Sequence, residues 1–324
     1  MKLRGLDPPD LVALEEALRR GESVHLDLQR DLPPEVRADQ LVPCVDRVKT
    51  RTPRFTEALS EHLPLPGRAD AQPLKVTAII PTHRHTPWGL DALRAQDCQV
   101  QVMVLANGQV DGVRGDRVLR VPWSGHGATR MEGVRAADTE YVLLTVDDAL
   151  PRGAGCVRAM VEALEEGGYD AVFGRQVPWP TADAVTRERL QSWTPAGRGH
   201  WAVERLDNVF ALYRRSALLD HPLPSVPIGE DLHWRQGRRI GYVPGAVVVH
   251  SHPRRARELY LRTRDLHLQH QLLGEPPLVP SLASLVGALP GLVRPVIQNG
   301  PAELKCQLAE LWGQYRATRL AQRS

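Results

Sequence analysis

Cysteine is rare in this chain, which has 324 residues and four cysteines. They are widely separated in the sequence, at Cys44, Cys98, Cys156 and Cys306. Zinc clusters need cysteine or histidine ligands at short, regular spacings, and small secreted scaffolds need closely spaced cysteines that form several disulfides. The sequence therefore indicates neither of these classes.

Long apolar runs are also absent. No stretch reaches the length of about eighteen apolar residues that a transmembrane helix requires. The first seven residues lack the apolar core of a signal peptide. We therefore expect a cytoplasmic protein.

Neither sign of charge dominates the chain. The 41 Lys and Arg residues nearly balance the 38 Asp and Glu residues, so the net charge is +3. This excess is too small to indicate a nucleic-acid partner. It is concentrated in residues 251–324, which carry ten basic and five acidic residues. The hydrophobic fraction of 42% and the charged fraction of 24% are typical of a soluble globular protein.

The chain divides into three parts, residues 1–72, 73–252 and 253–324. The first part is charged and rich in proline, with a predicted helix at 9–20 and a predicted linker at 64–70. It contains no catalytic motif, and its role stays open. The central part alternates strand-like and helical segments, which predicts an α/β fold with a mainly parallel sheet flanked by helices. The predicted strands are residues 75–80, 100–106, 117–121, 141–146, 171–174 and 246–250, and the predicted helices are residues 87–95, 129–137 and 155–166.

The third part is predicted to be helical. Leu304, Leu308, Leu311, Trp312 and Tyr315 recur at helical spacing and share one face of a helix. Such a stripe is typical of a helix that packs on a core. Because basic residues flank it, a helix that lies in a membrane interface is the alternative.

Residues 142–151 form the most informative segment. An apolar strand ends there in two adjacent carboxylates, Asp147 and Asp148, and Pro151 follows. Buried carboxylates must be hydrated, paired or bound to metal, and ligands bind at the carboxyl ends of strands in open α/β sheets. Mg²⁺ and Mn²⁺ prefer oxygen ligands and bridge to phosphates, so the segment indicates a nucleotide-diphosphate site. A turn with two solvated acids remains the alternative.

Other strand ends carry polar turns. Residues 79–84 end the first central strand, and Asn107 with Gly108 ends the second. A nucleotide can bind at such turns, but ordinary loops have the same composition. The glycine-rich stretch 125–130 opens a helix, where the helix N-terminus and Arg130 can bind a diphosphate.

Two later segments carry acid–base and metal-binding side chains. Glu230 and Asp231 open a predicted helix, where an acidic residue is either a normal helix-start residue or a general base for a hydroxyl group. His250 and His252 end an apolar strand, and their spacing places both on one face. A neutral imidazole there can complete a metal site with a carboxylate.

Taken in order, these segments resemble the family 2, GT-A fold glycosyltransferases, and within them the bacterial rhamnosyltransferase-type branch. The resemblance covers about residues 75–265 and is carried by segments 79–84, 127–133, 145–151, 174–176, 208–216, 229–234 and 241–252. It implies a GT-A domain over 73–252, with a mainly parallel, Rossmann-like sheet for a nucleotide-diphosphate sugar.

The resemblance also implies a role for each matching residue. Asp231 would be the catalytic base. The donor would be bound by Pro81, Thr82, Arg84, Asn107, Arg130, Asp147 and Asp148. The donor-sugar or acceptor pocket would be lined by Arg175, Gln176, Glu230 and Trp234. A divalent cation, Mg²⁺ or Mn²⁺, would be bound by Asp148 and His250.

The implied activity is inverting transfer of a sugar from a nucleotide-diphosphate donor to a hydroxyl group of a glycan or lipid-linked acceptor, in surface polysaccharide assembly. The basic C-terminal region would suit peripheral association with the inner face of the membrane. Two positions depart from the family pattern: Val146 replaces the first acid of the metal motif, and Met131 replaces an asparagine after Arg130. A catalytically silent GT-A-like protein that binds a nucleotide or acts as a scaffold is the alternative. A nucleotidyltransferase fits poorly, because the loop 81–87 contains no glycine.

Overall fold

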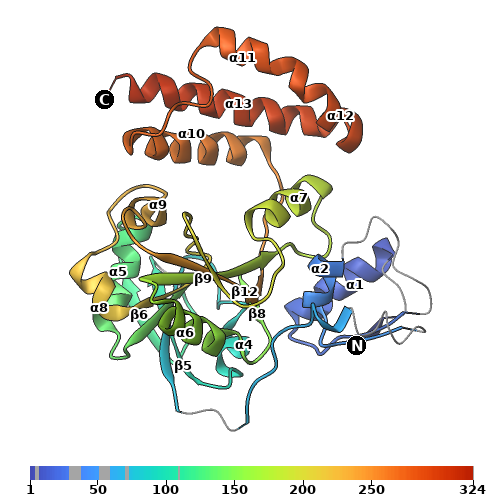
Figure 1. Cartoon of the computed structure of the whole chain (residues 1–324), viewed down its shortest axis with the longest axis vertical. Helices are drawn as coiled ribbons and strands as arrows, with labels where there is room; N and C mark the ends of the chain where they lie inside the picture. Colours follow the sequence, from blue (N-terminus) through green and yellow to red (C-terminus); the bar gives the residue numbers. More distant parts are fainter. Residues whose placement is uncertain (4–6, 29–37, 51–58, 70–72, 109, 324) are drawn as a thin grey trace.

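The protein is described by a computed structural model that covers residues 1–323 except 4–6, 29–37, 51–58, 70–72 and 109. Figure 1 shows three regions: a small N-terminal unit, a central sheet with flanking helices, and a layer of helices at the C-terminal end. This arrangement matches the α/β architecture and the helical C-terminal region that the sequence predicts.

Nine described strands form the central sheet, in the order β10-β12-β9-β11-β7-β4-β5-β6, and β8 pairs with β12 outside this path. The strands are β4 (Lys75–Thr82), β5 (Gln99–Asn107), β6 (Arg117–Val121), β7 (Tyr141–Thr145), β8 (Leu150–Arg152), β9 (Ala171–Val177), β10 (Trp201–Val203), β11 (Phe210–Arg214) and β12 (Ile240–Val249). All six predicted strands are present. The largest difference is in β12, which begins six positions earlier than predicted and is interrupted by an irregularity between Val243 and Val247.

The sheet is mixed. Strands β4, β5, β6 and β7 are parallel, whereas β11 runs antiparallel to both of its neighbours, β7 and β9. Because β11 is antiparallel to both β7 and β9, these two strands are parallel to each other, and β12 is parallel to β9. The prediction of a mainly parallel sheet is correct for β4, β5, β6, β7, β9 and β12. The antiparallel pairings involve β8, β10 and β11, short strands that the sequence pattern did not reveal.

Apolar residues cover both faces of the sheet. On β4, Ala78 and Ile80 belong to one apolar cluster, while Ile79 belongs to a second cluster on the opposite face. This follows from the alternation of side chains along a strand and explains the continuous apolar run. The helices that flank the sheet are α4 (Leu90–Arg94), α5 (His126–Ala136), α6 (Cys156–Gly167), α7 (Ala184–Trp193), α8 (Arg215–Asp220) and α9 (Glu230–Trp234). All four cysteines are buried and form no disulfide.

The N-terminal unit packs directly on the central sheet. It contains a parallel sheet of β1 (Lys2–Leu3), β2 (His25–Asp27) and β3 (Arg47–Lys49), with helices α1 (Pro8–Arg19) and α2 (Ala38–Leu41). Its buried residues Leu14 and Leu18 belong to the same apolar cluster as Val177 and Val247 of the central sheet. The predicted helix at 9–20 is confirmed as α1, which begins and ends one position earlier than predicted.

The predicted linker is packed against the central region over its described part, residues 64–69, and Asp70 lies outside the described residues. The main-chain oxygen of Leu65 accepts a hydrogen bond from the Gly155 amide at 3.1 Å. A Cβ atom on Gly153, whose φ is +82°, would lie 2.4 Å from the same oxygen. Glycine at position 153 is therefore required by both the backbone conformation and this close approach.

The C-terminal layer consists of α10 (Ala256–Leu272), α11 (Leu282–Ala288), α12 (Val293–Asn299) and α13 (Pro301–Ala321), with a 3₁₀ turn between α11 and α12. The expectation that the stripe on α13 packs on a core is wrong for Leu304, Leu308 and Trp312, which are exposed. Helix α13 instead packs on α10 through small residues, including Gly313, where a Cβ atom would lie 2.9 Å from the main-chain oxygen of Tyr260. None of the described helices is both long enough and apolar enough to cross a membrane.

Candidate active site

The candidate site lies at the carboxyl edge of the central sheet. Because β4, β7, β9 and β12 run in the same direction, the residues that follow them meet at one edge. Asp147 and Asp148 follow β7, Gln176 lies near the end of β9, and His250 follows β12. The folding of these segments therefore brings together carboxylate and imidazole groups that are about a hundred positions apart in the sequence.

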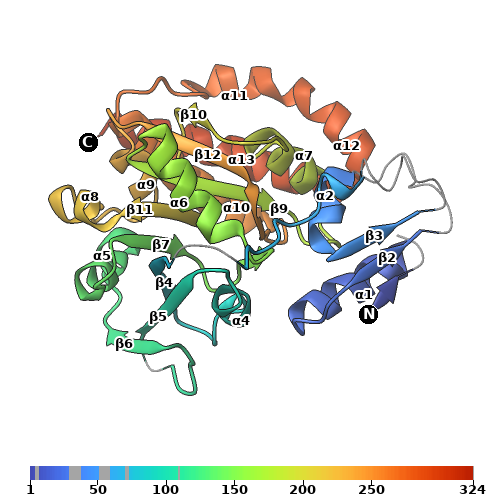
Figure 2. The ribbon, with the colours of Figure 1, turned by 60° about the horizontal axis from the view of Figure 1, so that its bottom comes forward.

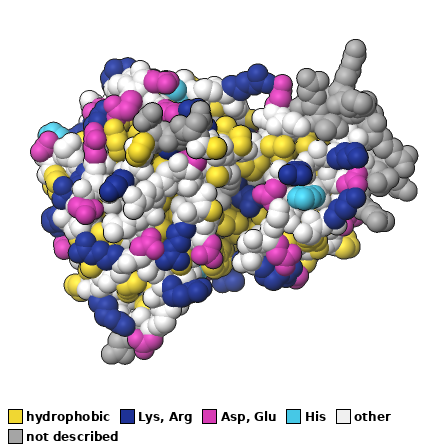
Figure 3. Space-filling model, turned by 90° about the horizontal axis from the view of Figure 1, so that it is seen from below, with side chains coloured by type: hydrophobic (Ala, Val, Ile, Leu, Met, Phe, Trp, Pro, Cys, Tyr) yellow, Lys and Arg dark blue, Asp and Glu magenta, His cyan; other side chains and the backbone are white. Residues whose placement is uncertain are grey.

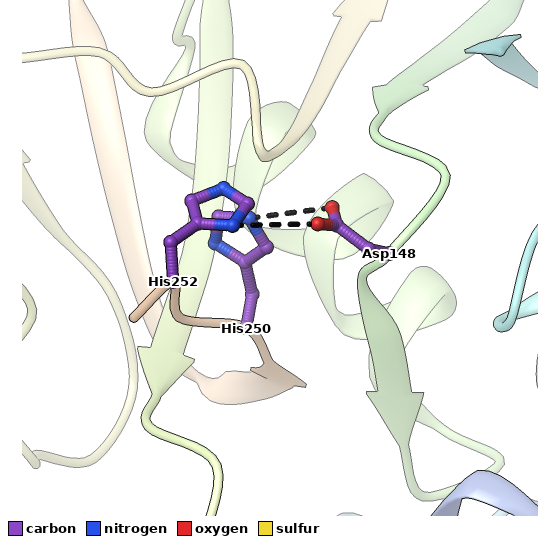
Figure 4. Close-up of side chains that lie close together, drawn as sticks. All are labelled: Asp148, His250 and His252. Carbon is purple, nitrogen blue, oxygen red and sulfur yellow. Dashed lines mark ion pairs between the residues drawn. The ribbon is translucent and has the colours of Figure 1, made fainter. Parts of the chain in front are cut away.

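Asp148, His250 and His252 form a compact group of potential metal ligands (Figure 4). Both imidazole rings face the Asp148 carboxylate. The Nε2 atom of His250 lies 3.5 Å from Oδ1 of Asp148, and Nδ1 of His252 lies 3.5 Å from Oδ2. Burial alone would raise the pKa of Asp148, but the hydrogen bond and charge of His250 outweigh burial and lower this pKa to about 2. The carboxylate is therefore ionised at neutral pH.

Gln176 orients His250. Nδ1 of His250 lies 2.9 Å from Oε1 of Gln176, and Nε2 of the same glutamine donates to Asp207 at 2.6 Å. The amide oxygen can only accept a hydrogen bond, so Nδ1 of His250 donates to it and Nε2 faces Asp148. If a cation were bound, the Nε2 lone pair would point at it. Hydrogen bonds of this kind fix the tautomer of metal-binding histidines.

The three side chains fit a divalent cation by their donor chemistry. Their ligand atoms lie within 4.8 Å of one another, and two ligands of one cation at about 2.1 Å are separated by roughly 3 Å in an octahedral arrangement. One carboxylate and two imidazoles form a mixed oxygen and nitrogen set, which suits Mn²⁺ better than Mg²⁺. The sequence identified Asp148 and His250 for this site, while His252 is the ligand candidate that it left without a role.

Replacement of Gln176 by leucine should weaken metal binding. The Gln176→Leu variant loses the acceptor for His250 Nδ1, so we expect the affinity for Mn²⁺ to fall by about 10- to 100-fold, measured by calorimetric titration. The matched control is Gln236→Leu, because Gln236 is exposed and none of its described hydrogen bonds is with a ligand candidate. Unchanged Mn²⁺ affinity in the Gln176 variant would show that the hydrogen bond from His250 to Gln176 does not support metal binding.

Glu230 and Asp231 open α9 and occupy different environments. Gly229 precedes them with a φ of +81°, a left-handed conformation that glycine adopts without strain. Glu230 is buried and pairs with Arg130, and it also accepts a hydrogen bond from the Asn208 amide at 3.2 Å. Burial would raise the pKa of Glu230, but the Arg130 charge outweighs burial and lowers it. Glu230 is therefore an ionised partner of Arg130.

Asp231 has no cationic partner among its described contacts. Its carboxylate accepts hydrogen bonds from the main-chain amides of Asn208 at 3.2 Å and Leu232 at 2.8 Å. Burial, together with the charges of Glu230 and Asp207, raises the pKa of Asp231 to about 7. A carboxylate with a pKa near neutrality is suited to accept a proton during a reaction.

Asp207 and Asn208 connect the two groups. The Asp207 carboxylate binds the Gln176 amide, which orients His250, while the next residue, Asn208, donates to both Glu230 and Asp231. Tyr213 on β11 donates to the Asn208 side chain at 2.6 Å and so fixes its orientation. The dipeptide Asp207-Asn208, which precedes β11, therefore links the metal-ligand candidates to the candidate base.

The predicted donor-binding residues lie at the ends of β4 and β5. Thr82 is buried and donates to the Asp147 carboxylate at 2.6 Å, which ties the ends of β4 and β7 together. Pro81 is the penultimate residue of β4, and Arg84 is exposed just beyond this strand. Asn107 ends β5 and donates to the main-chain oxygen of Val121 at 3.3 Å.

Three predicted site residues make contacts away from the metal-ligand group. Arg130 is buried in its pair with Glu230. Arg175 donates to the main-chain oxygen of Asp39 in the N-terminal unit at 2.5 Å. Trp234 is buried in the apolar cluster next to α5 and donates to the main-chain oxygen of His221 at 2.7 Å. Each of these three side chains is thus bound to other parts of the protein.

The structure adds residues that motif reasoning missed. Asp207 and Asn208 lie in a resemblance segment or beside it, but only their contacts show what they do. Arg262 lies on α10, outside the catalytic motifs. Burial and the charge of His250 lower the pKa of His252, and the charges of Arg262 and Arg84 act in the same direction. The C-terminal layer therefore contributes a positive charge that acts on His252, which only the folded arrangement reveals.

Comparison with known proteins gives one family match and related proteins. Residues 106–220 match the family model described as "Glycosyl transferase family 2". This range includes Asp147, Asp148 and Asn208, while Asp231 and His250 lie outside it. The O-antigen chain rhamnosyltransferase RfbN of Salmonella typhimurium (strain LT2) is 25% identical over 229 residues, which cover 61% of this chain and 73% of the relative.

Among solved structures, the mannosyltransferase PcManGT from Pyrobaculum calidifontis, in complex with GDP-Man and Mn²⁺, is similar to this chain. The TM-score is 0.56 and the sequence identity is 18%, and the match covers 97% of this chain and 100% of the other. This likeness concerns the fold.

Proposed function

We propose that this chain, whose residues 106–220 match the glycosyl transferase family 2 model, is a glycosyltransferase that transfers a sugar from a nucleotide-diphosphate donor with inversion at the anomeric carbon. The observation that carries the proposal is the link, through Asp207 and Asn208, between a metal-ligand group and a carboxylate whose pKa is raised to about 7. Glycosyl transfer needs both functions, one for the leaving group and one for the attacking hydroxyl group.

In this proposal Asp148, His250 and His252 hold a divalent cation, and their mixed donor set favours Mn²⁺ over Mg²⁺. When bound, the cation supplies positive charge beside the diphosphate. The similarity to a mannosyltransferase whose structure contains Mn²⁺ is consistent with this choice. Gln176 keeps the Nε2 lone pair of His250 directed at the site.

Asp231 is the base. Its carboxylate accepts the proton of the acceptor hydroxyl group as the acceptor oxygen attacks the anomeric carbon. The bond between that carbon and the diphosphate oxygen breaks, and the nucleoside diphosphate leaves with the electron pair. A single displacement of this type inverts the anomeric centre. Glu230 cannot replace Asp231 in this step, because it is paired with Arg130.

The remaining residues position the donor. We assign the binding of the donor's nucleobase and ribose to the sheet edge formed by Pro81, Thr82, Asn107 and Asp147, in accordance with the family pattern. Arg84 is exposed at this edge, and the positive charge of Arg262 on α10 acts on His252 in the same direction as that of Arg84. Both cations are available for the donor phosphates, whereas Arg130 neutralises Glu230.

The similarity to an O-antigen chain rhamnosyltransferase supports a role in polysaccharide assembly, with a glycan or lipid-linked acceptor. A donor screen tests the proposal. Thermal unfolding is measured with dTDP-, UDP- and GDP-sugars in the presence of Mn²⁺ or a chelator, and the best donor is then tested for hydrolysis and transfer. We expect one donor class to raise the melting temperature in the presence of Mn²⁺.

Hydrolysis or transfer of that donor would support an enzyme, and a product of inverted anomeric configuration would support the single displacement. Donor binding without any hydrolysis or transfer would instead favour the catalytically silent alternative. A product with retained configuration would contradict the role of Asp231 as the base for the acceptor.

A further inference from the structure

The C-terminal layer exposes large apolar side chains on its outermost helices. Helix α11 has no buried residue, although six of its seven residues are apolar or glycine. Val286 on this helix is 56% exposed, and Ile297 on α12 is 78% exposed. The exposed apolar residues of this segment, here called the apolar C-terminal face, are Leu278, Leu282, Val286, Leu289, Val293 and Ile297. Contiguous exposed apolar residues of this kind mark an interaction surface.

The charge pattern around this face is one-sided. No acidic residue occurs from 276 to 302, and Arg294 is the only charged residue there. On the neighbouring α13, the exposed side chains Leu308 and Trp312 share about a third of the helix circumference with the exposed Lys305, Arg316 and Arg319. Apolar and basic side chains on the same exposed surface are typical of a segment that binds the surface of an anionic bilayer.

The face of the molecule opposite the C-terminal layer has a different surface. Figure 3, which views the molecule from below, shows Lys, Arg, Asp and Glu side chains of both signs interspersed across that face. Figure 1 places α11 and α12 at the opposite end of the molecule. The apolar C-terminal face, with no acidic residue in 276–302, therefore differs from the face that Figure 3 shows, where acidic side chains lie among the basic ones.

We propose that the apolar C-terminal face docks on the surface of a bilayer that contains anionic lipids. A second copy of this chain fits less well, because a twofold pairing of this face would bring the basic side chains of α13 from both copies together. Anionic lipid head groups complement these charges, while the acyl region accepts Leu, Val and Ile side chains.

Docking would orient the active site. Helix α10 lies between the outer helices and the catalytic segment: Nε2 of His233 on α9 lies 2.9 Å from Oε1 of Gln269 on α10. A Cβ atom on Gly229, next to Glu230, would lie 3.5 Å from Leu266 on α10. Helix α9, which carries the candidate base Asp231, therefore packs on the C-terminal layer. This inference rests on the proposed function where it names a lipid-linked acceptor, which the bilayer would present.

Flotation of the full chain with vesicles tests the proposal. The vesicles contain phosphatidylcholine alone or phosphatidylcholine with phosphatidylglycerol. We expect binding to the anionic vesicles, with a partition coefficient that falls by about tenfold in the double variant Val286→Asn, Ile297→Asn. The matched control is Val12→Asn, Val118→Asn, which makes the same change at exposed residues of α1 and β6 and should leave binding unchanged. The double variant Arg316→Gln, Arg319→Gln should bind anionic vesicles more weakly than the wild-type chain, and its binding should change less with salt concentration.

Three results would overturn the proposal: absence of binding to both vesicle types, equal binding by the wild-type chain and the Val286, Ile297 variant, or a concentration-dependent dimer in sedimentation velocity that this variant dissociates. The last result would identify a second copy as the occupant. Donor binding is measured in parallel without vesicles. If vesicles bind but no nucleotide sugar does, the proposed function fails while the docking surface stands.

Discussion

Replacement of Asp231 by asparagine is expected to lower the rate of sugar transfer by about a thousandfold, because an amide cannot accept the proton of the acceptor hydroxyl group. Asparagine has nearly the same shape and retains one side-chain oxygen, which can accept one of the two hydrogen bonds that the main-chain amides of Asn208 and Leu232 donate to different oxygens of Asp231. The fold and the donor affinity should therefore change little. The measurements are the transfer rate at saturating donor and the donor dissociation constant.

The Asp220→Asn variant serves as the control for this change, since Asp220 is exposed at the end of α8. It should retain the full transfer rate. Substantial transfer by the Asp231 variant would refute the assignment of the base. A large loss of donor affinity in this variant would instead place Asp231 among the donor-binding residues.

The pH dependence gives a second readout of the same residue. Because burial raises the pKa of Asp231 to about 7, the transfer rate should increase as the pH rises through this value and level off above it. Stability should show the opposite trend. The folded state retains the proton more strongly than the unfolded state, so the contribution of Asp231 to stability decreases as the pH rises from about 4 to about 7. The asparagine variant should lack both dependences.

Replacement of Asp148 by alanine is expected to weaken Mn²⁺-dependent donor binding by about a hundredfold or more. Asp148 is the only carboxylate in the described metal-ligand group, so its removal leaves two neutral imidazoles and no anionic ligand. Loss of a supporting side chain already costs 10- to 100-fold in metal affinity, and loss of the ligand should cost at least as much. The measurement is the donor-induced rise in melting temperature, with Mn²⁺ and with a chelator.

The matched control for this variant is Asp138→Ala, because Asp138 is exposed in the turn after α5. In the control, Mn²⁺ should still strengthen donor binding. If the Asp148 variant bound the donor as tightly as the wild-type chain, and if the chelator had no effect on either protein, Asp148 would not be a metal ligand.

The strands that carry the site were predictable because their residues are nearly all apolar and end abruptly in polar groups. Strand β7 shows this clearly: a buried apolar run, Thr145, and then Asp147 and Asp148. The exposure of Leu304, Leu308 and Trp312 was not predictable in this way. A helical stripe shows that apolar residues share a face, but it does not show whether another element covers that face.

Local sequence also could not reveal the charge balance of the site. Glu230 and Asp231 are adjacent acids in different surroundings. Arg130, a hundred positions earlier, neutralises Glu230, while Asp231 receives main-chain hydrogen bonds and contacts no cation among the described residues. The orientation of His250 depends in the same way on Gln176 and Asp207, which come from other segments. Contacts between distant segments set these properties, and no spacing rule encodes them.

The sequence by itself determined the α/β class, the position of the carboxylates after β7 and the presence of histidines after β12, because strand patterns and strand ends are local features. The tertiary structure decided which of these groups act together. The segment before the antiparallel strand β11 places Asp207 and Asn208 between the metal-ligand group and Asp231, and no described residue covers the apolar face of the C-terminal layer. Both outcomes depend on which distant segments pack against one another, and that choice follows from the burial of whole faces rather than from any single motif.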